Sequence, residues 1–86
     1  MRNRADTNQN RIVKYLRETG KTVMVLSQVG YGCPDLLVGF RGRNWLFEVK
    51  GKNGRLSQTQ QEWHELWRGC VYVVRTVKEV RDILGD

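Results

Sequence analysis

Cysteine, proline and long apolar runs are scarce in this sequence. Only two cysteines, Cys33 and Cys70, occur among the 86 residues, too few for a disulfide framework or a cysteine-rich zinc site. No apolar run approaches the roughly 20 residues that span a bilayer, and the Arg- and Asn-rich start lacks a signal-peptide core. We therefore expect a cytoplasmic protein with no membrane partner.

Length and composition predict one small folded domain over residues 1–86. The chain is 40% hydrophobic and 28% charged and contains three tryptophans, which is typical of a globular domain. A domain this small buries only about 60 to 65% of its extended-chain surface, so a second copy would add stability. A homodimer is therefore expected.

Positive charge exceeds negative charge along the whole chain. There are 15 Lys and Arg residues against 9 Asp and Glu residues, a net charge of +6. This excess favours a polyanionic partner, usually nucleic acid, although a soluble protein with a solvated basic face has the same composition.

Hydrophobic periodicity predicts an α/β fold with a mixed sheet. The expected order is a helix over residues 7–19, strands over 22–29, 35–40 and 44–50, a helix over 58–68, a strand over 70–74 and a helix over 78–84. Segment 70–74 is apolar throughout and predicts a central strand buried on both faces.

Strands 35–40 and 44–50 are expected to form a hairpin with one charged and one apolar face. A two-residue turn at Arg41-Gly42 sets Asp35 opposite Glu48, and a four-residue loop sets it opposite Lys50. Both registers gather these three ionisable residues on one face. The other face collects the apolar residues Leu36, Val38, Phe40, Trp45, Phe47 and Val49.

The charged face is suited to metal-assisted hydrolysis of a phosphodiester. Asp35 and Glu48 would repel each other unless a cation lay between them, and hard oxygen ligands suit Mg²⁺ or Mn²⁺. Lys50 is placed to orient or deprotonate an attacking water, or to stabilise charge developing at phosphorus. Taken alone, Glu48 and Lys50 also fit an exposed ion pair.

Three motifs in order resemble those of a known nuclease family. Gly32-Cys33-Pro34-Asp35, Glu48-Val49-Lys50 and Leu56-Ser57-Gln58-Thr59-Gln60 are similar to the GxPD, ExK and LSxxQ motifs of the VRR-NUC nucleases, a branch of the PD-(D/E)xK phosphodiesterases. The resemblance covers nearly the whole chain, because the smallest stand-alone members, often phage-encoded, have about this length. It implies a restriction-endonuclease-like core.

The resemblance also implies a role for each matching residue. Asp35 and Glu48 would bind Mg²⁺, or Mn²⁺ in its place, through their side chains, and Val49 through its backbone carbonyl. Lys50 would serve the nucleophilic water, and Gln60 would support the catalytic group from the following helix. No small-molecule cofactor is implied.

Two amides near this set are less well defined. Gln60 lies three residues after Ser57 and so also matches a capping box, and the two roles compete for one side chain. Family members commonly carry a glutamate on the first helix facing the metal, and Gln9, three residues before Ile12, is our best match here. Because an amide is a weaker ligand than a carboxylate, binding of a second metal ion is left open.

The resemblance and the charge together predict a Mg²⁺-dependent endonuclease acting on branched DNA. Stand-alone members are associated with homodimers that resolve four-way junctions, and a phage-encoded one would act in the host cytoplasm. The expected DNA contacts are Arg11, Lys14, Tyr31, Lys52 and Arg55. Two alternatives stay open: a non-catalytic basic nucleic-acid-binding module, and a nuclease acting on flap DNA or RNA.

The remaining candidates have structural interpretations. Trp45, Trp63 and Trp67 can stack on bases, but their apolar stripes favour core or dimer packing. We expect His64 to be a surface residue and not a metal ligand, and Cys33 to be a small buried side chain.

Overall fold

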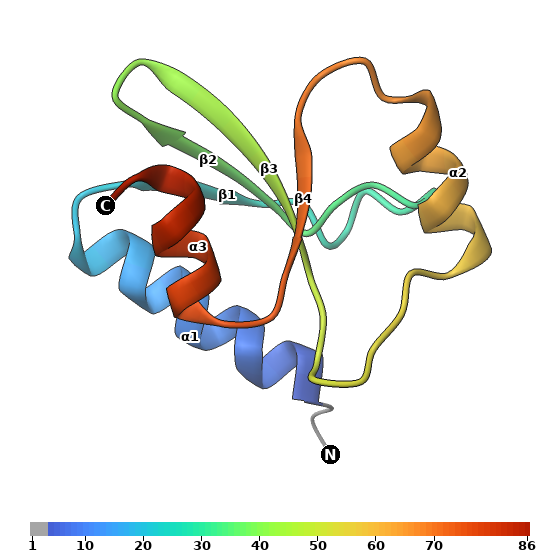
Figure 1. Cartoon of the computed structure of the whole chain (residues 1–86), viewed down its shortest axis with the longest axis horizontal. Coiled ribbons are helices and arrows are strands. Elements are labelled where there is room, and N and C mark those ends of the chain that lie inside the picture. Colours follow the sequence, from blue (N-terminus) through green and yellow to red (C-terminus); the bar gives the residue numbers. More distant parts are fainter. Residues whose placement is uncertain (1–3) are drawn as a thin grey trace.

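The computed structural model describes residues 4–86 as three helices and one four-stranded sheet (Figure 1). The elements are α1 (Arg4–Glu18), β1 (Thr22–Val25), β2 (Leu36–Phe40), β3 (Arg43–Val49), α2 (Gln58–Leu66), β4 (Val71–Val74) and α3 (Val77–Leu84). The strands lie in the order β1-β2-β3-β4, antiparallel except for the parallel pair of β3 and β4. The predicted element order and mixed sheet are therefore confirmed.

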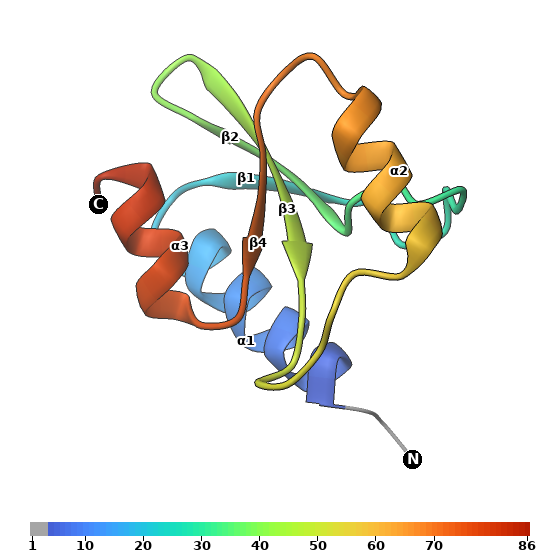
Figure 2. The ribbon, with the colours of Figure 1, turned by 45° about the vertical axis from the view of Figure 1, so that its right-hand side comes forward.

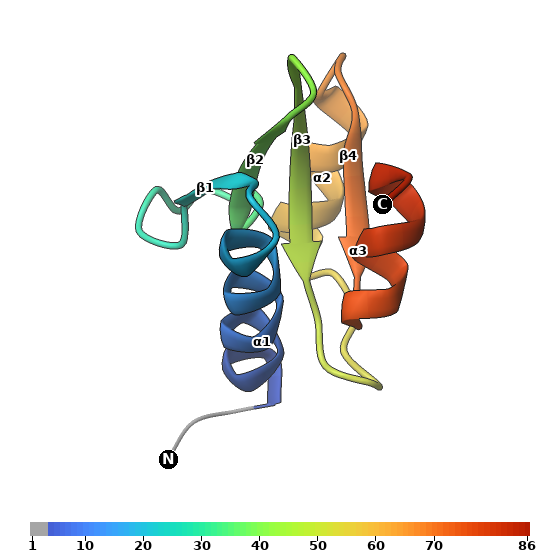
Figure 3. The ribbon, with the colours of Figure 1, turned by 90° about the vertical axis from the view of Figure 1, so that its left-hand side faces the viewer.

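Helices α1 and α3 cover one face of the sheet, and α2 lies over the other (Figure 3). The core lies on the α1 and α3 side and consists of Ile12, Leu16, Leu36, Val38, Phe47, Val49, Val74, Val80 and Leu84. Each large apolar side chain buried there contributes about 1.5 to 3 kcal/mol. None of the residues Gln58–Leu66 of α2 is buried, so α2 depends on a few specific contacts.

The hairpin of β2 and β3 has the expected two-residue turn. Phe40 pairs with Arg43, and the two turn residues Arg41 and Gly42 have left-handed φ angles of 53° and 75°. Such angles match the twist of a tight hairpin. The apolar alternate residues of both strands therefore face α1 and α3, as predicted.

Two strands differ from the prediction. β4 is an edge strand in which only Val74 is buried, because its other face is largely uncovered. β1 ends at Val25 and not at residue 29, since the Leu26 N–H donates to the Asp35 carbonyl and the chain then turns. The helix boundaries move by a few residues only. Within residues 4–86, no helix is long and apolar enough to cross a membrane.

Candidate active site

Asp35 directly precedes β2, and Glu48 lies on the neighbouring strand β3. Because Leu36 pairs with Phe47, the next pair along the hairpin is Asp35 and Glu48. Asp35 is fixed by the Val49 N–H, which donates to its Oδ2 at 2.8 Å. Glu48 is only 1% exposed, and its buried Oε1 has no hydrogen-bond partner among the described residues.

This environment opposes the charge of Glu48. Burial and the adjacent Asp35 carboxyl raise the pKa of Glu48 to about 8, although Lys50 acts in the opposite direction. A buried carboxylate beside a second one is stabilised as an anion when a cation binds both. The partnerless oxygen and the hard donor set thus fit a divalent cation. In the part of the chain described, no three His, Cys, Asp or Glu residues converge on a potential metal site.

Lys50 and Gln60 complete the polar cluster. The Lys50 Nζ donates to Gln60 Oε1 at 2.7 Å and lies 3.5 Å from Glu48 Oε2. Gln60 Nε2 donates to the same Glu48 oxygen at 3.4 Å. The lysine is therefore held beside the carboxylates by two partners, with its position restricted before any substrate arrives.

Gln60 makes a capping contact and a contact with Lys50 at the same time. Its Oε1 accepts from the Ser57 N–H at 2.9 Å as well as from Lys50, and Ser57 Oγ accepts from the Gln60 N–H at 3.2 Å. The two contacts are compatible because a carbonyl oxygen has two lone pairs. The capping box thus positions the amide that contacts Lys50.

A glycine brings the loop before Asp35 against α2. A Cβ on Gly32 would lie 2.5 Å from the Thr59 carbonyl oxygen and 3.1 Å from the Trp63 Cβ, and Gly32 has a left-handed φ of 82°. In Figure 2 this loop lies beside the first turns of α2. The contact therefore ties Asp35 on the sheet to Gln60 on α2.

Helix α1 contacts the site through Asn8, a residue that the sequence analysis missed. Asn8 Nδ2 donates to the Lys50 carbonyl at 3.0 Å, and its position four residues before Ile12 was the available signal for an inward-facing side chain. Gln9, our expected match to the family's glutamate, donates instead to Ser27 Oγ at 3.3 Å.

His64 and Cys33 also lie near the cluster. His64 is half-buried, against the prediction of a surface residue. Its Nε2 is buried without a partner among the described residues, and burial, followed by the Lys50 charge, lowers its pKa. Cys33 is half-buried, and burial together with the charges of Glu48 and Asp35 raises its pKa.

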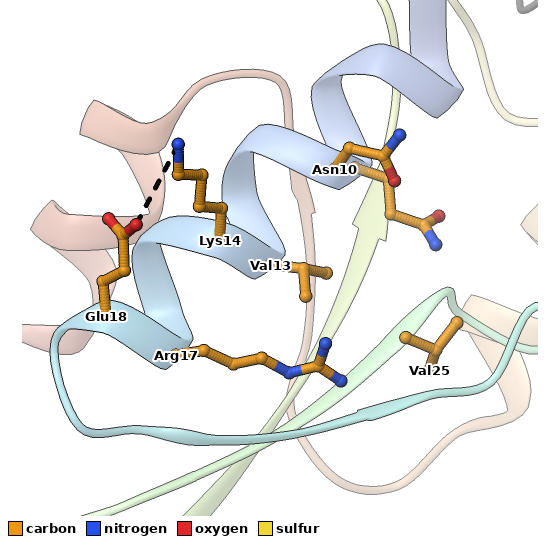
Figure 4. Close-up of a pocket in the computed structure, with 7 residues that line it drawn as sticks. Asn10, Val13, Lys14, Arg17, Glu18 and Val25 are labelled. Atoms are coloured by element: carbon orange, nitrogen blue, oxygen red, sulfur yellow. Dashed lines mark ion pairs between the residues drawn. The ribbon is translucent and has the colours of Figure 1, made fainter.

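The five expected DNA contacts do not share one surface. Arg11 and Lys52 line the same pocket, of about 240 Å³. Lys14 lines a different pocket, between α1 and β1, and pairs with Glu18 at 4.0 Å (Figure 4). Tyr31 is 91% exposed at the tip of the loop before Asp35, and Arg55 is exposed before α2.

A four-stranded mixed sheet with helices on both faces fits the restriction-endonuclease-like fold that we expected. The chain belongs to the VRR-NUC family, because the model of the VRR-NUC domain matches residues 3–78. It is also similar to a solved structure described as a VRR_NUC domain, with 31% identity and a TM-score of 0.78 over 98% of this chain and 97% of that one. No curated protein matches the chain. The family resemblance is thus confirmed, and with it a nuclease-type function with DNA as substrate.

Proposed function

We propose that the protein is a Mg²⁺-dependent, structure-specific endonuclease that acts as a homodimer on four-way DNA junctions. The observation that carries the proposal is the meeting of the Asp35 and Glu48 carboxylates, with Lys50 beside them and one buried carboxylate oxygen without a partner. The family supplies the nuclease class, and these contacts suggest how the bond is cut.

In this proposal Asp35 and Glu48 hold Mg²⁺, or Mn²⁺ in its place, together with the Val49 carbonyl. Such an ion would neutralise the two carboxylates and polarise a substrate phosphate oxygen. Val49 supports the site in a second way, since its N–H orients Asp35. The chain's own contribution is to keep these oxygens close before DNA binds, so that little reorganisation accompanies the reaction.

Lys50 serves the attacking water. Its ammonium, held by Gln60 and Glu48, can orient a water and offset the negative charge that grows at the phosphate. The water oxygen bonds to phosphorus while the bond from phosphorus to the leaving sugar oxygen breaks. Gln60 positions Lys50 and does not itself need to touch the substrate.

Two cuts on opposite strands require two sites, which is why we propose a homodimer and a branched substrate. One chain has a radius of gyration of 12.2 Å, and the proposed site in it is the set of Asp35, Glu48 and Lys50. A two-fold pair would present two clusters in symmetry-related positions. Both cysteines are free, which fits a reducing compartment such as the cytoplasm of a host cell.

The test is cleavage of labelled four-way, flap and linear duplex DNA, and of RNA, with and without Mg²⁺. Asp35→Asn and Lys50→Ala should lower the cleavage rate about a hundredfold or more and keep DNA binding. Glu65→Gln, an equivalent acid-to-amide change at an exposed position of α2, should cut as the wild type does.

Three results would contradict the proposal. A folded wild-type protein that binds DNA but cuts no substrate would favour the non-catalytic module. Preferred cleavage of flaps or RNA would replace the four-way junction as substrate. An Asp35→Asn protein as active as the Glu65→Gln control would remove Asp35 from the reaction.

A further inference from the structure

Two neighbouring pockets lie beside α1, close to the loop that follows β3. One, of about 340 Å³, lies between α1 and the start of α3, and the other, of about 240 Å³, lies between α1 and the loop after β3. Asn8 and Arg11 line both pockets. Figure 3 shows the start of α1, the loop after β3 and the start of α3 towards the same end of the molecule. We call these two pockets, which share Asn8 and Arg11, the basic groove.

The basic groove gathers cations from four separate segments. Arg11 comes from α1, Lys52 from the loop after β3, Arg75 from the residue after β4 and Lys78 from α3, and no acidic residue among those whose side chains are described lines either pocket. Residues far apart in the chain thus converge on one surface, which a basic composition alone does not produce. A row of cations of this kind is suited to a row of phosphates.

Two described acids of α3, Glu79 and Asp82, already have partners. Glu79 accepts from the Arg75 N–H at 2.9 Å and from the Thr76 hydroxyl at 3.3 Å, and Asp82 pairs with Lys78 at 2.8 Å across the exposed face of α3. An exposed pair of this type contributes only about 0 to 1 kcal/mol, so Lys78 can exchange Asp82 for a stronger anion. The first N–H groups of α3, beside Thr76, also favour an anion.

The basic groove is held in place and is connected to the candidate active site. The Arg75 guanidinium donates to the Gly54 carbonyl, which fixes the loop after β3 against the end of β4. Asn8, at the junction of the two pockets, donates to the carbonyl of Lys50, the residue whose ammonium lies beside the carboxylates. A strand leaving the site around the end of β3 would therefore enter the groove.

We propose that the basic groove binds backbone phosphates of the DNA strand that flanks the cleaved bond, an inference that rests on the proposed function. Arg11, Lys52, Arg75 and Lys78 are its phosphate ligands. Guanidinium groups bind phosphate oxygens through paired hydrogen bonds, and such contacts position a duplex without reading its sequence. The groove thus sets where along the DNA the scissile phosphate lies.

The first experiment measures DNA binding against salt concentration in EDTA, where no cleavage occurs. The test protein is Arg11→Ala/Lys78→Ala, and the matched control is Arg17→Ala/Arg81→Ala, which removes equal charge from exposed positions of the same two helices. Each lost phosphate contact should reduce the slope of log K against log salt by about 0.9. We expect the test protein to lose about two contacts and bind at least about tenfold more weakly than the control. Equal slopes and affinities for the two proteins would overturn the proposal.

The second experiment removes charge from the DNA. Methylphosphonates replace the phosphates on either side of the cleavage position, and affinities of the wild type and the Arg11→Ala/Lys78→Ala protein form a double-mutant cycle. Neutral methylphosphonates should weaken binding by the wild type about tenfold, and binding by the variant, which keeps only Lys52 and Arg75, by clearly less. Losses of affinity that simply add up in the cycle would overturn the proposal. If the losses add up and inorganic phosphate also protects the wild type from thermal unfolding, the groove is a site for free phosphate.

Failure of the groove and failure of the nuclease can be told apart. Binding that shows the expected difference between the variant pairs, from a protein that never cuts, would leave the groove standing and remove the nuclease proposal. Normal junction cleavage, with no difference in DNA binding between the two double variants, would remove the groove proposal and leave the nuclease proposal standing.

Discussion

Glu48 is the residue whose surroundings least favour its own charge. It is 1% exposed and faces Asp35, and its pKa is raised to about 8. An unfolded glutamate titrates near 4.3, so between that pH and about 8 the folded protein holds a proton that the unfolded chain has lost. The metal-free protein should therefore lose stability as the pH rises through this range, and the loss should level off above about pH 8.

Glu48→Gln should remove this pH dependence because an amide has no proton to lose. In EDTA at pH 8 we expect the variant to be more stable than the wild type by about 1 to 3 kcal/mol, and the difference should shrink towards pH 5. Urea unfolding at the two pH values measures it. Mg²⁺ should stabilise only the wild type, since a ligand of the folded state adds stability. Equal pH profiles of stability for the two proteins would show that ionisation of Glu48 does not cause the loss of stability at high pH.

Tyr31 is placed for contact with DNA at a conformational cost. It is 91% exposed with a left-handed φ of 56°, between Gly30 and Gly32, which also have positive φ angles. A left-handed conformation costs a non-glycine residue about 1 to 2 kcal/mol. Strain of this kind at a residue without burial suggests a role in binding, and an exposed ring beside the site can stack on an unpaired base.

Tyr31→Gly should therefore separate stability from binding. We expect the variant to unfold at the same or a higher urea concentration and to bind branched DNA about fivefold or more weakly, because stacking contributes about 1 to 3 kcal/mol. Tyr31→Phe keeps the ring and should bind as the wild type does. Fluorescence titration with 2-aminopurine at the branch point measures the stack. A Tyr31→Gly protein with unchanged affinity and signal would exclude it.

At the scale of the elements, the pairing of β2 with β3 could be predicted from the sequence. The contacts around β4 and α1 could not. Strict alternation and a two-residue turn decide a register, and the register alone brings Asp35 opposite Glu48. An apolar run such as Val71–Val74 reads the same whether the strand is central or lies at an edge with one face covered. The Asn8 contact with Lys50 depends on how α1 crosses the sheet, which local patterns do not determine.

The position of α2 depends on the close approach of Gly32, and this makes a sharp prediction. Gly32→Ala places a methyl group 2.5 Å from the Thr59 carbonyl oxygen, so the helix carrying Gln60 must move away from Asp35. We expect cleavage to fall at least about tenfold, because small displacements of positioning groups are costly in catalysis.

Gly30→Ala is the matched control for this prediction. Gly30 has a similar φ of 77°, but a Cβ there meets nothing within 4 Å. Both variants carry backbone strain of about 1 kcal/mol, and only Gly32→Ala adds the clash. Single-turnover cleavage and Trp63 fluorescence compare the two proteins. Equal losses of activity would mean that strain in the loop, and not the seating of α2, limits the reaction.

At the scale of the whole molecule, one large surface lacks the charge that covers the rest. Two adjoining pockets on the face of the sheet away from α1 share Leu37 and Asn44, and none of the charged residues with described side chains lines either of them. Next to them, Trp67 is 45% and Leu66 79% exposed, and Trp67 stacks on Trp63 at 4.7 Å. Contiguous apolar surface of this kind is typical of an interface. DNA is a poor fit, because no cation lines the pockets.

If the protein is a homodimer, as we propose, a second copy of the chain would cover this surface. Two bodies of charge +6 repel each other, and an interface without charged residues keeps the like charges apart while burying tryptophan, a residue enriched at interface centres. Contact through the same patch on both chains is the two-fold arrangement that places two active sites symmetrically. A two-fold dimer would therefore both cover the apolar patch and supply the two sites that the proposed pair of cuts needs.

Trp67→Glu should separate the dimer, because it places two carboxylates in the middle of a two-fold interface. Sedimentation should give twice the chain mass for the wild type and the single-chain mass for the variant, with dimerisation weakened about a hundredfold or more. Val29→Glu puts the same charge on a 54% exposed residue of the loop after β1 and should stay dimeric. The Trp67→Glu monomer should still nick a junction but lose paired cuts. A wild type that sediments as a monomer, or a Trp67→Glu protein that stays dimeric, would exclude this interface.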